Sequence, residues 1–290
     1  MGQHQHSQRN IAVAFFLNLA FTVIEIIGGF FTNSVAILSD ALHDLGDSLS
    51  LGMAWFLERY SRKKRDQKYT YGYGRFSLLA AMINGVVLIS GSVFIIYQAV
   101  PRLFNPISPD VTGMFWLAVL GVIFNGVAAA RLHHGKSLNE QMVSWHLWED
   151  VVGWIVVLIM SVVMYYYNLP ILDPLFSVLF TTYICYNVFK NLLRTIKIFL
   201  QAKPEGVDLH DLERRFGQIE GVVSVHDLHI WSLDGRYFIM TLHLVVQESV
   251  DKQRYIDIKT EAQELSQTLK INHITIEVEY ESEQCQLVDS

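Results

Sequence analysis

The sequence predicts a six-helix, all-α transmembrane domain followed by a cytoplasmic α+β domain of ferredoxin-like type. Three observations support this fold class. Of the 290 residues, 51% are hydrophobic and only 17% are charged, which is too apolar for an ordinary soluble protein. Six apolar stretches are long enough to cross about 30 Å of hydrocarbon. The composition then changes at Lys203-Pro204, so we expect domains at residues 1–203 and 204–290.

The six apolar stretches account for most of the first 200 residues. They cover residues 11–31, 35–57, 77–100, 112–131, 144–167 and 171–199. Lys and Arg are concentrated between the second and third stretches, at residues 59–75, and Arg131 and Lys136 lie between the fourth and fifth. The positive-inside rule therefore predicts a multi-pass protein with both termini in the cytoplasm.

The segment after residue 204 carries 17 acidic and 7 basic residues, a net charge of -10. Its expected elements are a short helix after Asp208, strands at residues 222–232 and 237–246, a helix at residues 255–269, and a strand at residues 273–280. Asp234-Gly235 is a strong hairpin signal between the first two strands. The order αββαβ predicts the ferredoxin-like type.

Two copies of the pattern His-x-x-x-Asp lie inside apolar stretches: His43 with Asp47, and His146 with Asp150. Residues four apart lie on one face of an α-helix, so each helix would present an imidazole and a carboxylate together. Ionisable groups are costly inside a bilayer and usually mark an ion pathway. The alternative is that these groups only pair with one another, but two identical spacings argue against coincidence.

If the two helices pack side by side, these four side chains supply the four tetrahedral ligands that Zn²⁺ prefers. Two carboxylates and two neutral imidazoles also cancel the charge of a divalent ion. Without metal, the carboxylates would lie close together in a low dielectric and should take up protons. Metal and protons would then compete for one site, which is the physical basis of an antiporter.

Other polar residues of the apolar stretches have alternative interpretations. Asp40 and Asp44 could line the same cavity, whereas Asp44 could also form an interhelical hydrogen bond. Glu25 and several asparagines are expected to lock helices together through such bonds.

The cytoplasmic segment contains a second group of metal-ligand residue types. His226, His229 and His243 lie in the hairpin strands, and the last strand alternates apolar residues with His273, Thr275, Glu277 and Glu279. These donors could build one or two metal sites. Histidines on exposed strand faces are also common without metal, so both interpretations stay open.

Several motifs, in order, resemble the signature of the cation diffusion facilitator family. They are Glu25-x-x-Gly28-Gly29, residues 34–47, Tyr71-Gly72-Tyr73-Gly74-Arg75, His146-x-x-x-Asp150 and residues 226–231. The resemblance covers nearly the whole chain. It implies a homodimer of six-span protomers in the lipid bilayer that exports divalent metal by alternating access, with protons as the counter-ion.

The resemblance also implies which residues bind metal. By position, the transport site is His43, Asp47, His146 and Asp150, and the cytoplasmic metal ligands are His226, His243 and Glu279, with His273 as a further ligand and Glu277 less certain. A site of two His and two Asp is similar to that of zinc-preferring members. Zn²⁺ is thus the expected cargo and regulator, with Cd²⁺ or Co²⁺ as alternatives.

The chain departs from the family pattern in two loops. Tyr69 stands where a histidine often accompanies Asp66, so a metal site in that loop is expected to be lost. The histidine-rich loop of eukaryotic vesicular relatives is reduced to His133-His134, which favours a protein of the prokaryotic inner (plasma) membrane.

Other function classes fit the sequence less well. An intramembrane metal hydrolase would need an open coordination position, and the chain lacks His-Glu-x-x-His. A nucleic-acid partner is not expected, because basic and aromatic residues are not interleaved. A passive channel stays an alternative, although a tight tetrahedral site suits conformational exchange better than rapid permeation. The sequence thus predicts a transporter and not an enzyme.

Overall fold

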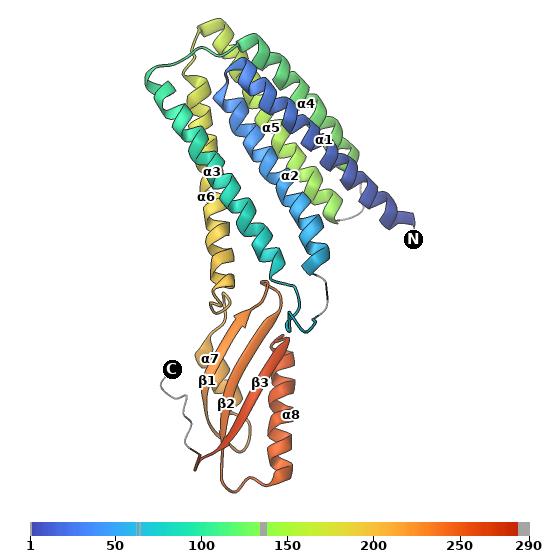
Figure 1. Ribbon diagram of the computed structural model, residues 1–290, viewed down its shortest axis with the longest axis vertical. Helices are drawn as coiled ribbons and strands as arrows, with labels where there is room; N and C mark the ends of the chain where they lie inside the picture. Colours follow the sequence, from blue (N-terminus) through green and yellow to red (C-terminus); the bar gives the residue numbers. More distant parts are fainter. Residues whose placement is uncertain (1, 62, 64, 134–137, 284–290) are drawn as a thin grey trace. The chain divides into compact units, whose positions relative to one another are not determined.

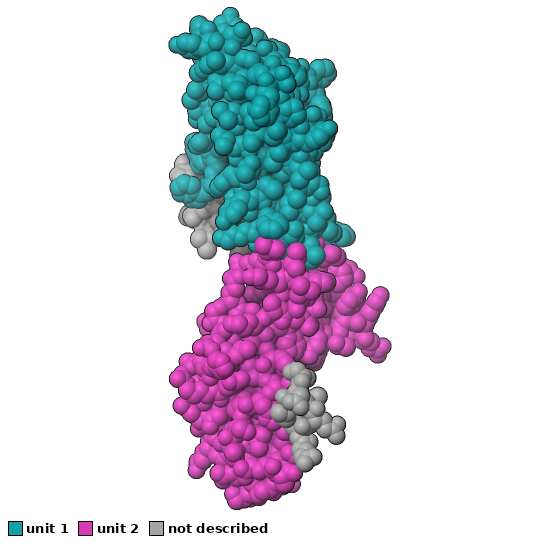
Figure 2. Space-filling view, turned by 90° about the vertical axis from the view of Figure 1, so that its left-hand side faces the viewer, with its two compact units in different colours: residues 1–59, 80–192 teal, residues 60–79, 193–290 magenta. Residues whose placement is uncertain are grey.

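A computed structural model describes residues 2–61, 63, 65–133 and 138–283. The side chains of residues 2–14, 51, 54–55, 58–59, 61, 131–133, 138–143 and 146 are outside this description. Several expectations fall there, including the side chain of His146, the pair His133-His134, and the basic residues Arg59, Arg62, Lys64, Arg131 and Lys136. The chain divides into two compact units, residues 1–59 with 80–192 and residues 60–79 with 193–290 (Figure 2).

In the part of the chain that the structure describes, six long helices account for most of the amino-terminal two thirds (Figure 1). They are α1 (Gly2–Thr32), α2 (Val35–Ser61), α3 (Phe76–Phe104), α4 (Val111–His133), α5 (Leu138–Tyr167) and α6 (Leu172–Phe199). Within the described residues, all except α2 are long and apolar enough to cross a membrane. At 27 residues, or about 40 Å, α2 is also long enough, but its acidic residues lower its hydropathy.

The first unit is held together by a core of large apolar side chains from four helices. Phe21 of α1, Ile37 of α2, Met114 of α4 and Trp154 of α5 are almost completely buried in one cluster. A Cβ atom on Gly121 of α4 would lie within 3 Å of the Trp154 ring, so the missing side chain lets the indole pack against α4. The predicted helical membrane domain is thereby confirmed.

The first turn of α2 is fixed by a residue from α6. Asp173, only 1% exposed, accepts hydrogen bonds from the backbone N–H groups of Val35 at 2.9 Å and Ala36 at 3.2 Å. These groups have no partner inside their own helix, so Asp173 caps α2 from another helix. Arg102 of α3 donates hydrogen bonds to the backbone and side-chain oxygens of Asn33 at the α1–α2 corner. The start of the helix that carries His43 and Asp47 is therefore held by α3 and α6.

The carboxy-terminal part has the predicted order αββαβ. Its elements are α7 (Leu209–Gly217), β1 (Val222–Ser232), β2 (Phe238–Val246), α8 (Lys252–Thr268) and β3 (His273–Tyr280). The strand order is β1-β2-β3, with β1 and β2 antiparallel and β2 and β3 parallel (Figure 1). As expected, Asp208 caps α7 by accepting a hydrogen bond from the His210 backbone N–H at 3.0 Å. The α+β prediction is confirmed.

The sheet separates a hydrophobic core from a polar face. Met240, Leu242 and Leu244 alternate along β2 and pack with Phe216 of α7 and Ile258 of α8 in one buried cluster. Because side chains alternate along a strand, the residues between them point to the other face. That second face carries the histidines and acidic residues predicted to bind metal.

Candidate metal centres

His43 and Asp47 lie one turn apart on α2, as their spacing predicts. Their side chains approach each other, with His43 Nε2 3.6 Å from Asp47 Oδ2, and each is 29% exposed. The His43 ring packs edge-on against Phe180 of α6, with ring centroids 5.9 Å apart. One helix face therefore presents an imidazole and a carboxylate together, within a polar interior that is partly open.

The partner pair lies on α5. Asp150 is buried, with 5% of its surface exposed, whereas the side chain of His146 lies outside the described residues. The charges of Asp47 and Asp150 both act on the Asp40 carboxyl group. The acidic residues of α2 and α5 thus lie within electrostatic range of one another.

Further carboxyl groups extend this acidic interior to α1. Glu25 and Asp44 are completely buried, and the carboxylate oxygens of both lack hydrogen-bond partners in the part of the chain that the structure describes. The indole N–H of Trp154 lies close to Glu25 without reaching hydrogen-bond geometry. The expected interhelical hydrogen bond of Glu25 is therefore not found among these residues. Buried carboxylates without donors need protons or a cation to offset the loss of solvation.

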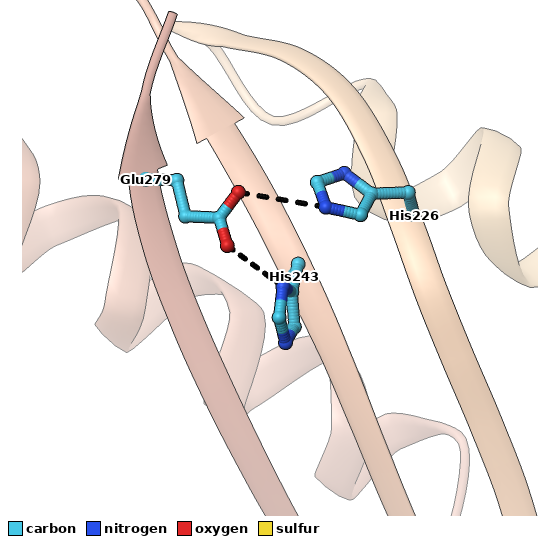
Figure 3. Close-up of side chains that lie close together, drawn as sticks. All are labelled: His226, His243 and Glu279. Atoms are coloured by element: carbon cyan, nitrogen blue, oxygen red, sulfur yellow. Dashed lines mark ion pairs between the residues drawn. The ribbon is translucent and has the colours of Figure 1, made fainter. Parts of the chain in front are cut away.

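The second candidate metal centre lies on the polar face of the carboxy-terminal sheet. His226 of β1, His243 of β2 and Glu279 of β3 place one ligand atom each within 4.8 Å of one another (Figure 3). His226 and His243 are direct cross-strand partners, and Glu279 pairs with Val245, two residues beyond His243. The Glu279 carboxylate extends toward both rings, with oxygens 2.8 Å from His243 Nδ1 and 3.5 Å from His226 Nε2 (Figure 3).

The chemistry of this cluster fits a divalent metal. His226 Nε2 is buried and lacks a hydrogen-bond partner within the described residues, although it points at Glu279. Two imidazoles and a carboxylate are ligand types that Zn²⁺ accepts, and three protein ligands leave a fourth position open. A bound metal would give His226 Nε2 the partner that it lacks among these residues.

The structure does not bring His273 to this cluster. His273 begins β3, where it pairs with Ile239, while Glu279 lies near the other end of the strand. At about 3.3 Å per residue the two positions are roughly 20 Å apart. The His273 ring instead packs edge-on against Tyr71, with centroids 5.6 Å apart. Glu277 is closer, with Oε2 3.5 Å from His243 Nε2, but its side chain is 65% exposed.

Asp66, in the loop between α2 and α3, is satisfied by the chain's own donors. Its carboxylate accepts hydrogen bonds from the Tyr73 hydroxyl at 2.6 Å and the Tyr69 backbone N–H at 2.8 Å, and Lys63 Nζ lies 3.6 Å away. The Tyr73 hydrogen bond, followed by the Tyr69 N–H, lowers the pKa of Asp66 to about 2. Both carboxylate oxygens of Asp66 thus have donors from the chain itself, and the loss of a loop metal site stays a prediction.

Asp227 lies beside this candidate centre, although the sequence alone does not predict a role for it. It lies at a β-bulge, where the pairing of β1 with β2 shifts between His226 and His229, and its φ is +48°. The sequence carries a signal of this bulge, because two polar residues, His226 and Asp227, separate the apolar Val225 and Leu228, which both pack on the core. In a regular strand, neighbouring core-facing residues are two positions apart and not three.

The chain resembles known cation efflux proteins over most of its length. Residues 11–200 match the cation efflux transmembrane domain, and residues 204–281 match the cytoplasmic domain of cation efflux proteins. The chain is 32% identical to the cadmium, cobalt and zinc/H⁺-K⁺ antiporter of Bacillus subtilis, over 96% of this chain and 92% of that protein. It is 31% identical to the metal cation efflux system protein CzcD of Cupriavidus metallidurans, with coverages of 95% and 89%. Identity to the zinc transporter ZitB of Escherichia coli is 29%, with coverages of 95% and 88%.

Proposed function

The chain belongs to the cation efflux family of membrane transporters, and we propose that it exports Zn²⁺ from the cytoplasm in exchange for protons. Proteins of this family are transporters and not enzymes. One observation carries the proposal: His43 and Asp47 share a face of α2, and the charges of Asp47 and of the buried Asp150 of α5 both act on Asp40. A metal-ligand pair next to buried carboxylates suits a cation that must be bound, neutralised and released.

In this proposal His43, Asp47, His146 and Asp150 hold the transported ion. Two nitrogen and two oxygen ligands suit tetrahedral Zn²⁺, and the two carboxylates balance its charge. The printed names of the relatives include zinc, cadmium and cobalt, which supports Zn²⁺ as cargo and Cd²⁺ or Co²⁺ as alternatives.

Proton exchange follows from the acidic interior. When Zn²⁺ leaves, Asp47 and Asp150 stay in a membrane cavity next to the carboxyl groups of Glu25, Asp40 and Asp44. Leaving several of them charged would be costly, so protons from the opposite side of the membrane should replace the metal. Deprotonation on the cytoplasmic side then restores the metal ligands and prepares the next cycle.

We also propose an organisation for the whole protein. Residues 1–203 form the transport domain and residues 204–290 the cytoplasmic domain, with both termini in the cytoplasm and the helices in the inner (plasma) membrane of a prokaryote. The match to the cytoplasmic domain of cation efflux proteins supports a homodimer through that domain. Cytosolic zinc at His226, His243 and Glu279 would stiffen the dimer contact, because the net charge of -10 after residue 204 otherwise resists association.

Transport in reconstituted vesicles tests the proposal. With the cytoplasmic side outward, an acidic lumen should drive zinc accumulation, and a protonophore should abolish it. Asp47→Ala and Asp150→Ala should each remove accumulation while the dimer stays folded. Retained transport in both variants would contradict the assigned site, and zinc flux insensitive to the pH gradient would favour passive permeation.

A further inference from the structure

We propose that Asp227 is a positioning residue for the cytoplasmic metal centre, where it accepts a hydrogen bond from Nε2 of His243 and fixes the imidazole with Nδ1 facing the metal. The proposal rests on the assignment of His226, His243 and Glu279 to that centre. Asp227 itself does not touch the metal. It acts through the orientation and basicity of His243.

His243 lies between two groups of carboxylates. Its Nδ1 is 2.8 Å from Glu279 Oε1, on the side of the metal centre. Its Nε2, on the other side of the ring, is 3.6 Å from Asp227 Oδ2 and 3.5 Å from Glu277 Oε2. The side chain is only 8% exposed, so the surrounding sheet restricts how the ring can turn. The two ring nitrogens therefore face different partners.

Metal binding decides which nitrogen keeps a hydrogen. A neutral imidazole that donates the lone pair of Nδ1 to a metal carries its N–H at Nε2, and metal-bound histidines almost always give that N–H to a carboxylate, a carbonyl or water. In a buried ring the N–H needs such an acceptor. The 3.6 Å separation from Asp227 is longer than a hydrogen bond, and a shift of roughly half an ångström would form one.

Asp227 is better placed for this role than Glu277. The side chain of Asp227 is 14% exposed, whereas that of Glu277 is 65% exposed. Water therefore weakens the interaction of Asp227 with His243 less than that of Glu277. The second oxygen of Asp227 is already held, because His229 Nε2 lies 2.8 Å from Asp227 Oδ1. A carboxylate fixed at one oxygen presents the other in a defined position.

The β-bulge explains how Asp227 reaches His243. In a regular strand Asp227 would point to the face opposite its neighbour His226, which is the core face. The register shift between His226 and His229 and the left-handed φ of +48° change this direction, and Leu228 takes the core position. Aspartate tolerates this backbone region better than most residues. The bulge thus aims the carboxylate at the polar face of the sheet.

Zinc titration of the full-length protein in detergent tests this role. The parent would carry Asp47→Ala and Asp150→Ala to disable the transport site. Asp227→Asn keeps the size and the backbone tolerance of the residue but removes the charge, and we expect zinc affinity to fall about 10- to 100-fold. His229→Ala, which removes the group that holds Asp227, should cause a smaller loss. Asp257→Asn on α8, which packs on the other face of the sheet, makes the same charge change and should leave affinity unchanged.

A second readout separates positioning from a structural role. Cobalt bound in place of zinc should show altered visible absorption bands in Asp227→Asn, while the metal-free variant melts at the same temperature as its parent. Affinity within twofold of the parent would overturn the role of Asp227. If Asp227→Asn does not fold, the test rests on His229→Ala, and unchanged affinity in that variant would equally overturn the role of Asp227. Unchanged affinity in His243→Gln and Glu279→Gln would instead show that the metal centre itself is misassigned.

Discussion

His43 Nε2 and Asp47 Oδ2 are 3.6 Å apart on one face of α2. This separation is short enough for the two groups to share a proton-dependent ion pair, and a divalent ion could replace the proton between them. The same two side chains can therefore serve either cation, but not both at once. In the transport site this exclusivity would link the departure of zinc to the arrival of protons.

Loss of the Asp150 carboxylate should abolish zinc transport. Asp150→Ala removes a buried carboxylate that we propose as a metal ligand, and without it the proposed site cannot complete four-fold coordination. Uptake into vesicles should therefore fall to the level of protein-free vesicles. The matched control is Asp110→Ala, which removes an exposed carboxylate between α3 and α4 and should preserve uptake. Equal uptake by Asp150→Ala and Asp110→Ala would show that Asp150 binds no cargo.

Replacing His43 should change which metal is carried. His43→Asp exchanges a nitrogen ligand for a third carboxylate, which weakens the preference for Zn²⁺ and adds negative charge to the site. The family resemblance links an additional Asp at this position with readier acceptance of Cd²⁺, so we expect the ratio of Cd²⁺ to Zn²⁺ uptake to rise, as measured by competition in vesicles. An unchanged ratio with undiminished transport would mean that His43 does not contact the metal.

The hydroxyl group of Tyr73 should stabilise the α2–α3 loop, whereas the hydroxyl group of Tyr69 should not. The Tyr73 hydroxyl donates to Asp66, whereas Tyr69 contributes only its backbone N–H. Tyr73→Phe should therefore speed amide hydrogen exchange of the loop, and Tyr69→Phe should leave it nearly unchanged. The pKa of Asp66 is lowered to about 2, so its contribution should be complete above about pH 4 and lost as the pH falls toward about 2. Faster exchange in both variants, or in neither, would contradict this account.

Removing the cap supplied by Asp173 should destabilise the membrane domain. Asp173→Ala leaves buried N–H groups of the first turn of α2 without an acceptor, at a cost of about 1–2 kcal/mol. Thermal unfolding in detergent would measure this loss. Asp110→Ala, which removes a more exposed cap of α4, should cost less. An Asp173→Ala protein as stable as the parent would show that α2 does not need this contact.

The sequence predicted the elements well because their periodicities are local. Apolar stretches of spanning length predicted all six helices, including α2, although its acidic residues keep it below the hydropathy of the other five. Alternation and the turn signal at Asp234-Gly235 located the hairpin, and His226, His243 and Glu279 come together as expected.

Features that depend on distant contacts were not predictable in this way. The cap of α2 by Asp173 joins residues about 140 positions apart and leaves no local signal. His273 and Glu279 share one strand face, but the length of β3 separates them. The bulge at Asp227 interrupts the alternation that predicts which face a residue occupies. Two adjacent polar residues between Val225 and Leu228 indicate the interruption but not the direction of the Asp227 side chain.

The central claim is that zinc and protons move in opposite directions through the site that contains Asp47 and Asp150. The most direct test records zinc and lumenal pH together in vesicles that begin with equal pH on both sides. Zinc added outside should enter while the lumen becomes alkaline, and Asp150→Ala should lose both signals. Zinc entry at the normal rate without any change in lumenal pH would contradict the account.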